Sequence, residues 1–96
     1  MPAIALVVEI QTQAGQRDAF LARLHQHKAN VLANEPGCKG FEILLAEDDA
    51  DSLVLYELYQ DEAALEAHDA APYFQAYRAD TAAMIANRRR ILCRPA

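Results

Sequence analysis

Residues 53–74, LVLYELYQDEAALEAHDAAPYF, join one predicted strand to two predicted helices. Residues 53–60 are rich in aliphatic and aromatic side chains, interrupted by the carboxylate of Glu57, and this composition is typical of a strand. Asp61 is a favourable N-cap for a short helix that runs to about His68. The proline of the Ala-Ala-Pro turn that follows suits the first turn of a further helix. The segment therefore predicts a strand and two helices.

The segments that precede residues 53–74 also have clear patterns of apolar residues. Residues 3–11, AIALVVEIQ, are mostly apolar and rich in β-branched side chains, which indicates a strand. Apolar residues between 16 and 34 recur at helical spacing instead. Glu35-Pro36-Gly37 ends that helix, because proline disfavours helical backbone in the residue before it. The predicted elements are a strand at residues 3–11, a helix at 16–34, strands at 39–46 and 53–60, helices at 61–68 and from 72, and a strand at 88–94.

This order, β-α-β-β-α(α)-β, is that of a ferredoxin-like α+β sandwich, with four antiparallel strands and helices on one face. Residues 3–11 and 53–60 are apolar on both strand faces, although helices can cover only one. The simplest cover for the second face is another copy of the same sheet in an isologous dimer. We therefore predict a single domain, residues 1–96, that forms a homodimer around an apolar interior.

Charge and composition exclude several classes of protein. The net charge is −5, and the chain between Glu42 and Asp69 contains acidic residues but no Lys or Arg, which argues against a nucleic-acid partner. No apolar run approaches the ~20 residues of a membrane span, and the N-terminal residues lack the features of a signal peptide. Cys38 and Cys93 do not make a disulfide framework. We expect a cytoplasmic protein with no membrane association.

Glu57 and Tyr59 share one face of the predicted strand at 53–60. A carboxylate among apolar residues must be paired or have a raised pKa, and a raised pKa suits a general acid or base. The alternative is a structural ion pair with one of the arginines at 88–90, and the sequence favours neither. Tyr59 is a candidate for a cavity wall, because a buried hydroxyl group needs a partner.

Two histidines and two aromatic residues complete the candidate site. His27 lies on the apolar stripe of the first helix, where it could transfer protons or be an ordinary core residue, and the second alternative is favoured. His68 ends the short helix, where it could act as a base or cap exposed carbonyl groups. Tyr73 and Phe74 could stack on an aromatic substrate or simply pack in the core. No Cys/His pattern has zinc spacing, so no metal site is predicted.

Together these motifs resemble a known family. The combination of E-P-G-C at 35–38, F-E-I at 41–43 and Y-E-L-Y-Q-D-E-A-A-L at 56–65, with His68 and P-Y-F at 72–74, resembles the antibiotic biosynthesis monooxygenase family over nearly the whole chain. The resemblance implies a homodimeric α+β barrel with a pocket between sheet and helices in each subunit. The family includes cofactor-free oxygenases of quinols and polycyclic phenols, an isomerase of a phosphorylated signalling molecule, haem-degrading enzymes and members of unknown activity.

Residue by residue, the resemblance implies catalytic roles for Glu57, His68 and His27. Tyr59 stands where many relatives have Trp. Leu44 stands where many relatives that look like monooxygenases have His, and where the isomerases share an aliphatic residue, so we expect Leu44 to line the substrate site. The resulting expectation is a pocket wall in which Glu57 and Tyr59, with Leu55, face the interior of the dimeric barrel. The substrate-binding residues are then Tyr59, Tyr73, Phe74 and Leu44.

Three functional hypotheses follow. The first is a cofactor-independent monooxygenase, in which His68 or His27, supported by Glu57, deprotonates a quinol or phenol whose anion reacts with O₂ while Tyr59 donates a hydrogen bond. The second is an isomerase that moves a proton next to the carbonyl of a small phosphorylated hydroxyketone, with an arginine near the C-terminus holding the phosphate. The third is a non-catalytic dimer that binds a small molecule in the same cavity.

Overall fold

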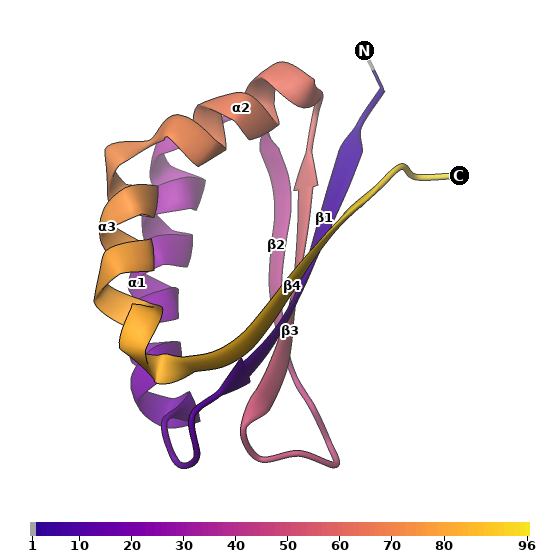
Figure 1. Ribbon diagram of the computed structural model, residues 1–96. Helices are drawn as coiled ribbons and strands as arrows, with labels where there is room; N and C mark the ends of the chain where they lie inside the picture. The colour runs from indigo at the N-terminus through magenta and orange to yellow at the C-terminus, as the bar shows by residue number, and fades with distance from the viewer. Residues whose placement is uncertain (1) are drawn as a thin grey trace.

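Four antiparallel strands form one sheet in the order β2-β3-β1-β4, and three α-helices lie against one of its faces (Figure 1). The structure, a computed structural model, describes residues 2–96. Its elements are β1 (Ile4–Thr12), α1 (Arg17–Asn34), β2 (Cys38–Leu45), β3 (Ser52–Tyr59), α2 (Glu62–Ala70), α3 (Pro72–Thr81), a 3₁₀ turn (Ala82–Met84) and β4 (Ile85–Cys93). The predicted ferredoxin-like α+β fold is confirmed.

Two predicted boundaries differ from the observed ones by more than one residue, for identifiable reasons. α2 continues past His68 to Ala70 and ends where Ala71, which precedes Pro72, adopts extended backbone. β4 begins at Ile85 rather than at residue 88, because it pairs with β1 from Thr12 to Ala5. Backbone pairing with a central strand, rather than the apolar content of residues 91–93, therefore sets the length of β4.

The strands alternate as predicted between a face covered by helices and an open face. On the covered face, β1 contributes Ile4, Leu6, Val8 and Ile10, and β3 contributes Leu53, Leu55, Glu57 and Tyr59, all of them buried. Phe20, Leu24, His27 and Val31 of α1 are the buried residues that meet this face. The main core therefore lies between the sheet and the helices, and it includes polar side chains.

The turn between α1 and β2 packs tightly against α2. A Cβ atom built on Gly37 would lie 2.6 Å from the Cβ atom of Ala64, so the absence of a side chain permits this approach. The backbone N–H of Gln60 also donates a hydrogen bond to the carbonyl oxygen of Gly37 at 2.8 Å. Asp61 caps α2 as predicted, because its carboxylate accepts a hydrogen bond from the backbone N–H of Ala64 at 2.9 Å. These contacts hold the turn between α1 and β2 against the start of α2.

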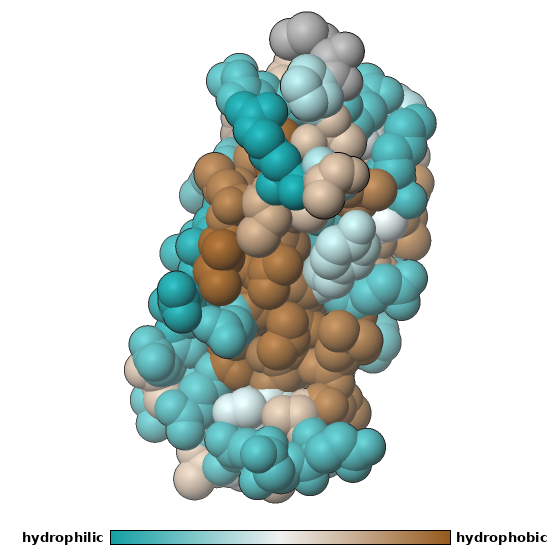
Figure 2. Space-filling model, turned by 90° about the vertical axis from the view of Figure 1, so that its right-hand side faces the viewer, coloured by the Kyte–Doolittle hydropathy of each residue, from teal (hydrophilic) through white to brown (hydrophobic). Residues whose placement is uncertain are grey.

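The open face of the sheet carries a broad apolar surface (Figure 2). Tyr56 is 37% exposed and Leu44 is 52% exposed on this face. By the strand register, the residues that share it with Tyr56 include Val7, Val54, Leu58 and Ile91. Within residues 2–96, no helix covers this surface, and no helix is long and apolar enough to cross a membrane.

Candidate functional site

His68 lies between two carboxylates in the layer between the sheet and the helices. Its Nδ1 atom is 3.0 and 3.2 Å from the two carboxylate oxygens of Glu35, and its Nε2 atom is 3.7 Å from Oε1 of Glu57. An ionised carboxylate only accepts hydrogen bonds, so Nδ1 donates its proton to Glu35. His68 is buried, and its side chain does not cap the carbonyl groups of α2, because its two ring nitrogens face Glu35 and Glu57.

Glu57 is paired with a tyrosine rather than with an arginine. The hydroxyl group of Tyr59 donates a hydrogen bond to Oε1 of Glu57 at 2.5 Å, and both side chains are buried. Burial raises the pKa of Glu57, and the hydrogen bond from Tyr59 opposes that shift. Arg90 instead forms an ion pair with Asp69 at 2.8 Å. The structural ion pair considered as an alternative for Glu57 is therefore absent among the described residues.

Glu35 is a further member of this cluster, although its position in the sequence predicts only the end of a helix. Besides the proton of His68, its carboxylate accepts a hydrogen bond from the hydroxyl group of Tyr73. Burial, together with this bond, raises the pKa of Tyr73. One sequence signal could have drawn attention to Glu35. A carboxylate at the C-terminal end of a helix opposes the helix dipole, so another interaction has to favour it there.

His27 is buried beside the cluster, as its position on the apolar stripe predicted. Its ring stacks on Tyr77, with 4.2 Å between ring centroids and 5° between ring planes, and its centroid is 5.6 Å from that of His68. Burial, together with the nearby side chains of His68 and Arg23, lowers the pKa of His27 to about 4. Its Nδ1 atom has no hydrogen-bond partner in the described part of the chain. His27 is thus neutral at neutral pH, with a free ring nitrogen.

Phe74 links the two histidines. Its ring centroid lies 4.9 Å from that of His68 and 5.7 Å from that of His27. The structure therefore brings six of the seven predicted site residues together, with Glu35 as an addition: His27, Glu57, Tyr59, His68, Tyr73 and Phe74.

Leu44 does not belong to this cluster, and its contact with a substrate stays a prediction. Leu44 pairs with Val54 on the open face, whereas Phe41 pairs with Glu57 on the covered face. Alternation along β2 sends residues 41 and 44 to opposite sides of the sheet. For the same reason, Glu57 and Tyr59 face the helix layer of their own chain. They do not face the apolar interior that a second sheet would enclose.

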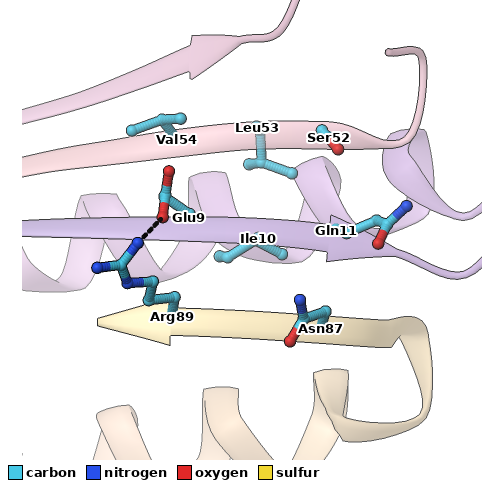
Figure 3. Close-up of a pocket in the computed structure, with 8 residues that line it drawn as sticks. All are labelled: Glu9, Ile10, Gln11, Ser52, Leu53, Val54, Asn87 and Arg89. Carbon is cyan, nitrogen blue, oxygen red and sulfur yellow. Dashed lines mark ion pairs between the residues drawn. The ribbon is translucent and has the colours of Figure 1, made fainter. Parts of the chain in front are cut away.

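The cluster is filled by side chains. Four surface hollows lie elsewhere on residues 2–96, and Glu35 is the one residue of the cluster that lines any of the four. One hollow, of about 310 Å³, lies between the α1–β2 turn and α2 and includes Glu35 and Asp61 in its wall. Another, of about 300 Å³, lies at one end of the open face beside the ion pair of Glu9 and Arg89, whose charged atoms are 3.6 Å apart (Figure 3). No three His, Cys, Asp or Glu side chains of the described residues are placed to hold a metal ion.

The arrangement resembles several known proteins. A family model described as "Antibiotic biosynthesis monooxygenase" matches residues 3–80. A "putative antibiotic biosynthesis monooxygenase" of Caulobacter crescentus superposes with a TM-score of 0.95 at 24% identity, covering 99% of this chain and 91% of that one. One of Nitrosomonas europaea has a TM-score of 0.91 at 23% identity, with coverages of 97% and 89%.

A third solved structure, a Bacteroides thetaiotaomicron protein of unknown function described as a "possible oxidoreductase", has a TM-score of 0.89 at 18% identity and covers 98% of both chains. No curated protein matches the chain. At these identities, the solved structures show a shared fold.

Proposed function

The chain belongs to the antibiotic biosynthesis monooxygenase family, and on that premise we propose that it is a cofactor-independent monooxygenase acting on a quinol or phenolic small molecule. The observation that supports this proposal most is the position of His68, buried against aromatic rings with Glu57 facing its second ring nitrogen. A base, a hydrogen-bond donor and an apolar surrounding are the groups that such a reaction needs.

We assign His68 as the base and His27 as a group that orients the substrate. A histidine with a pKa of about 4 is a weak proton acceptor at neutral pH, but its free Nδ1 atom can accept a hydrogen bond from a phenolic hydroxyl group. His68 faces a carboxylate at each ring nitrogen, and these charges stabilise the imidazolium that forms when it takes a proton.

The reaction balances without a further reductant. Proton transfer to His68 leaves an anion whose charge is spread onto an activated ring carbon. That carbon forms a bond to O₂, which gains two electrons, and the proton held by His68 passes to the outer oxygen to give a hydroperoxide. Loss of the remaining hydrogen from the carbon, with cleavage of the O–O bond, gives a carbonyl group and water. One oxygen atom enters the product and the other leaves as water.

Tyr59 supplies the hydrogen bond to the developing peroxide in this scheme. Its hydroxyl group donates to Glu57 in the structure, so it must exchange partners during the reaction. Because Phe74 contacts both histidine rings, we expect the substrate to enter by displacing this side chain.

Oxygen consumption tests the activity. The protein would be incubated with a naphthohydroquinone, a tricyclic phenol and a benzoquinol under ¹⁸O₂, with an oxygen electrode and mass spectrometry as the readouts. We expect oxygen uptake and one labelled atom in the product. His68→Asn should lower the rate by at least about 100-fold, whereas His25→Asn, at an exposed position of α1, should not.

The remaining hypotheses give different outcomes once a phosphorylated hydroxyketone is added to the compounds tested. An isomerase would convert a phosphorylated hydroxyketone equally well without oxygen, and a binding protein would turn over none of the compounds. Uptake that is absent for every phenol, or a label that comes from water, would refute the proposal. Leu44 pairs with Val54 on the open face, away from His68, so its aliphatic side chain does not distinguish an isomerase from an oxygenase within this cluster.

We also propose that a second copy of the chain covers the open face, with the two sheets packed face to face. The exposed apolar surface of β2 and β3 supports this arrangement. Sedimentation equilibrium at micromolar concentration is expected to give the mass of a dimer, and a stable monomer would contradict it.

A further inference from the structure

We propose that Glu35 is a positioning residue that fixes the tautomer and the orientation of His68. This inference rests on the proposed function only in treating His68 as the base. The contact itself is independent of any reaction, and so is its principal test.

Glu35 holds one side of the imidazole ring. Its two carboxylate oxygens lie 3.0 and 3.2 Å from Nδ1 of His68, and the hydroxyl group of Tyr73 donates to Oε2. With Nδ1 committed as the donor, Nε2 is the nitrogen that faces Glu57 and the interior. The hydrogen bond made by one ring nitrogen determines which form the other takes. Glu35 therefore leaves Nε2 as the nitrogen that can accept a proton.

The backbone around Glu35 is held against the helix that carries His68. Gly37 packs on Ala64 of α2, and Gln60, just before α2, donates to the carbonyl oxygen of Gly37. Glu35 and His68 are thus connected to the same rigid junction, although 33 residues separate them in the sequence. A short, well-supported contact of this kind can hold a ring orientation accurately.

The two carboxylates that face His68 have different surroundings. The side chain of Glu35 is 10% exposed and lines the hollow of about 310 Å³ beside α2. Glu57 lies deeper, and burial raises its pKa. Hydration favours an ionised carboxylate and burial disfavours it. Glu57 is thus the more enclosed of the two carboxylates, whereas Glu35 is the one that holds Nδ1 of His68 through two short contacts.

Nitrogen-15 NMR of the histidine rings tests this directly, because the chain has three histidines. Long-range ¹H–¹⁵N spectra of the full chain distinguish the two neutral tautomers. We expect His68 to carry its proton on Nδ1 in the parent protein. In Glu35→Leu, which lacks the acceptor, the proton should move to Nε2 in part or completely. An unchanged Nδ1–H tautomer in this variant would overturn the proposal.

A near-isosteric variant separates the charge from the hydrogen bond. In Glu35→Gln the amide oxygen can still accept from Nδ1, but as a neutral and therefore weaker partner. We expect the Nδ1–H resonance of His68 to move upfield in Glu35→Gln. If Glu35→Leu does not fold, this shift tests whether Glu35 positions His68. A resonance that stays in place would contradict the proposal. Glu66→Gln is the matched control. Glu66 is exposed on α2, the helix that carries His68, and its replacement should leave the resonance unchanged.

Kinetics with the phenolic substrate give a second readout. We expect Glu35→Gln to lower kcat about 10- to 100-fold, as is typical when the partner of a functional histidine is removed, with KM changed by less than about twofold. An unchanged kcat would refute the positioning role. If the parent protein oxidises no phenol at all, the proposed function fails, and the NMR result still decides the role of Glu35.

Discussion

Tyr56 and Glu57 are neighbours on β3, yet they belong to opposite surfaces. Glu57 points to the helix-covered face, where it is buried with Tyr59 and His68. Tyr56 points to the open face, where it is 37% exposed among other apolar residues. The usual distribution is thus reversed, because titratable groups are enclosed and apolar groups are left in contact with solvent.

The two faces differ in whether their side chains have partners within the chain. Glu35, Glu57 and His68 have polar partners within the chain, whereas Nδ1 of His27 has none among the described residues. The apolar residues of the open face have no such cover from the described residues, and a surface of this kind usually marks an interface. One face therefore indicates chemistry and the other indicates assembly, and substitutions can test them separately.

The largest effect is expected from a charge on the open face. In a two-fold symmetric interface, Tyr56→Glu places one carboxylate from each subunit among apolar side chains. An unpaired buried charge costs several kcal/mol. We expect self-association to weaken by at least about 1,000-fold, or about 4 kcal/mol, in sedimentation equilibrium. Leu32→Glu on α1, where the leucine is 53% exposed, makes the same kind of change elsewhere and should have no effect. Equal association of both variants would remove the distinction between the faces.

On the covered face, acid is expected to destabilise the fold through His27. The pKa of His27 falls from 6.5 to about 4 on folding, so between these values the unfolded chain binds more protons than the folded one. Stability is then lost as the pH falls from 6.5 towards 4, by up to about 3 kcal/mol. Urea unfolding at pH 7 and pH 4.5 should show a smaller loss in His27→Phe than in the parent protein. His25→Phe, at an exposed site, should lose as much stability between the two pH values as the parent protein does. An equal loss of stability in all three proteins would contradict the prediction.

Removing the charge of Glu57 should affect activity without affecting assembly. Glu57→Gln keeps the shape of the side chain but can no longer share a proton with His68. We expect kcat/KM for the phenolic substrate to fall about 100-fold, or about 2.7 kcal/mol, while the mass in sedimentation stays that of the parent. Glu42→Gln provides the control, because Glu42 pairs with Tyr56 on the open face. A fully active Glu57→Gln would show that the carboxylate is structural.

The smallest effect concerns how α2 is held over the covered face. In Gly37→Ala the new methyl group would lie 2.6 Å from Cβ of Ala64, which requires a shift of the turn or of α2. We expect a loss of about 1–3 kcal/mol in urea unfolding. In Gly40→Ala the nearest atom would be 3.7 Å away, so the loss should be smaller. Adding Ala64→Gly to Gly37→Ala should recover part of the stability, and a purely additive double variant would rule out the contact.

Much of the fold and part of the site could be predicted from periodicity. The strand period placed Glu57 and Tyr59 on one face, and the helical period placed His27 inward with Phe20 and Leu24. Both are local patterns, and the structure confirms them. The expectation for Leu44 rests on family resemblance instead. Alternation along β2 places its side chain on the face opposite to that of Phe41.

Glu35 could not be found in this way. Its partners, His68 and Tyr73, lie 33 and 38 residues further along the chain. No local period reports a contact between the end of α1 and the later helices. The filling of the predicted pocket by Phe74 and its neighbours is equally a result of side-chain packing in three dimensions, which composition does not reveal.

The strand order has a consequence for how the protein is made. β1 leaves the ribosome before β3 and β4, which are its two neighbours in the sheet. Until residues 85–93 have been synthesised, the side of β1 that pairs with β4 is an unpaired sheet edge. Folding during translation is therefore expected to wait for the last strand. A ribosome-stalled chain that exposes residues 1–84 should remain sensitive to protease, and the addition of β4 should make it resistant.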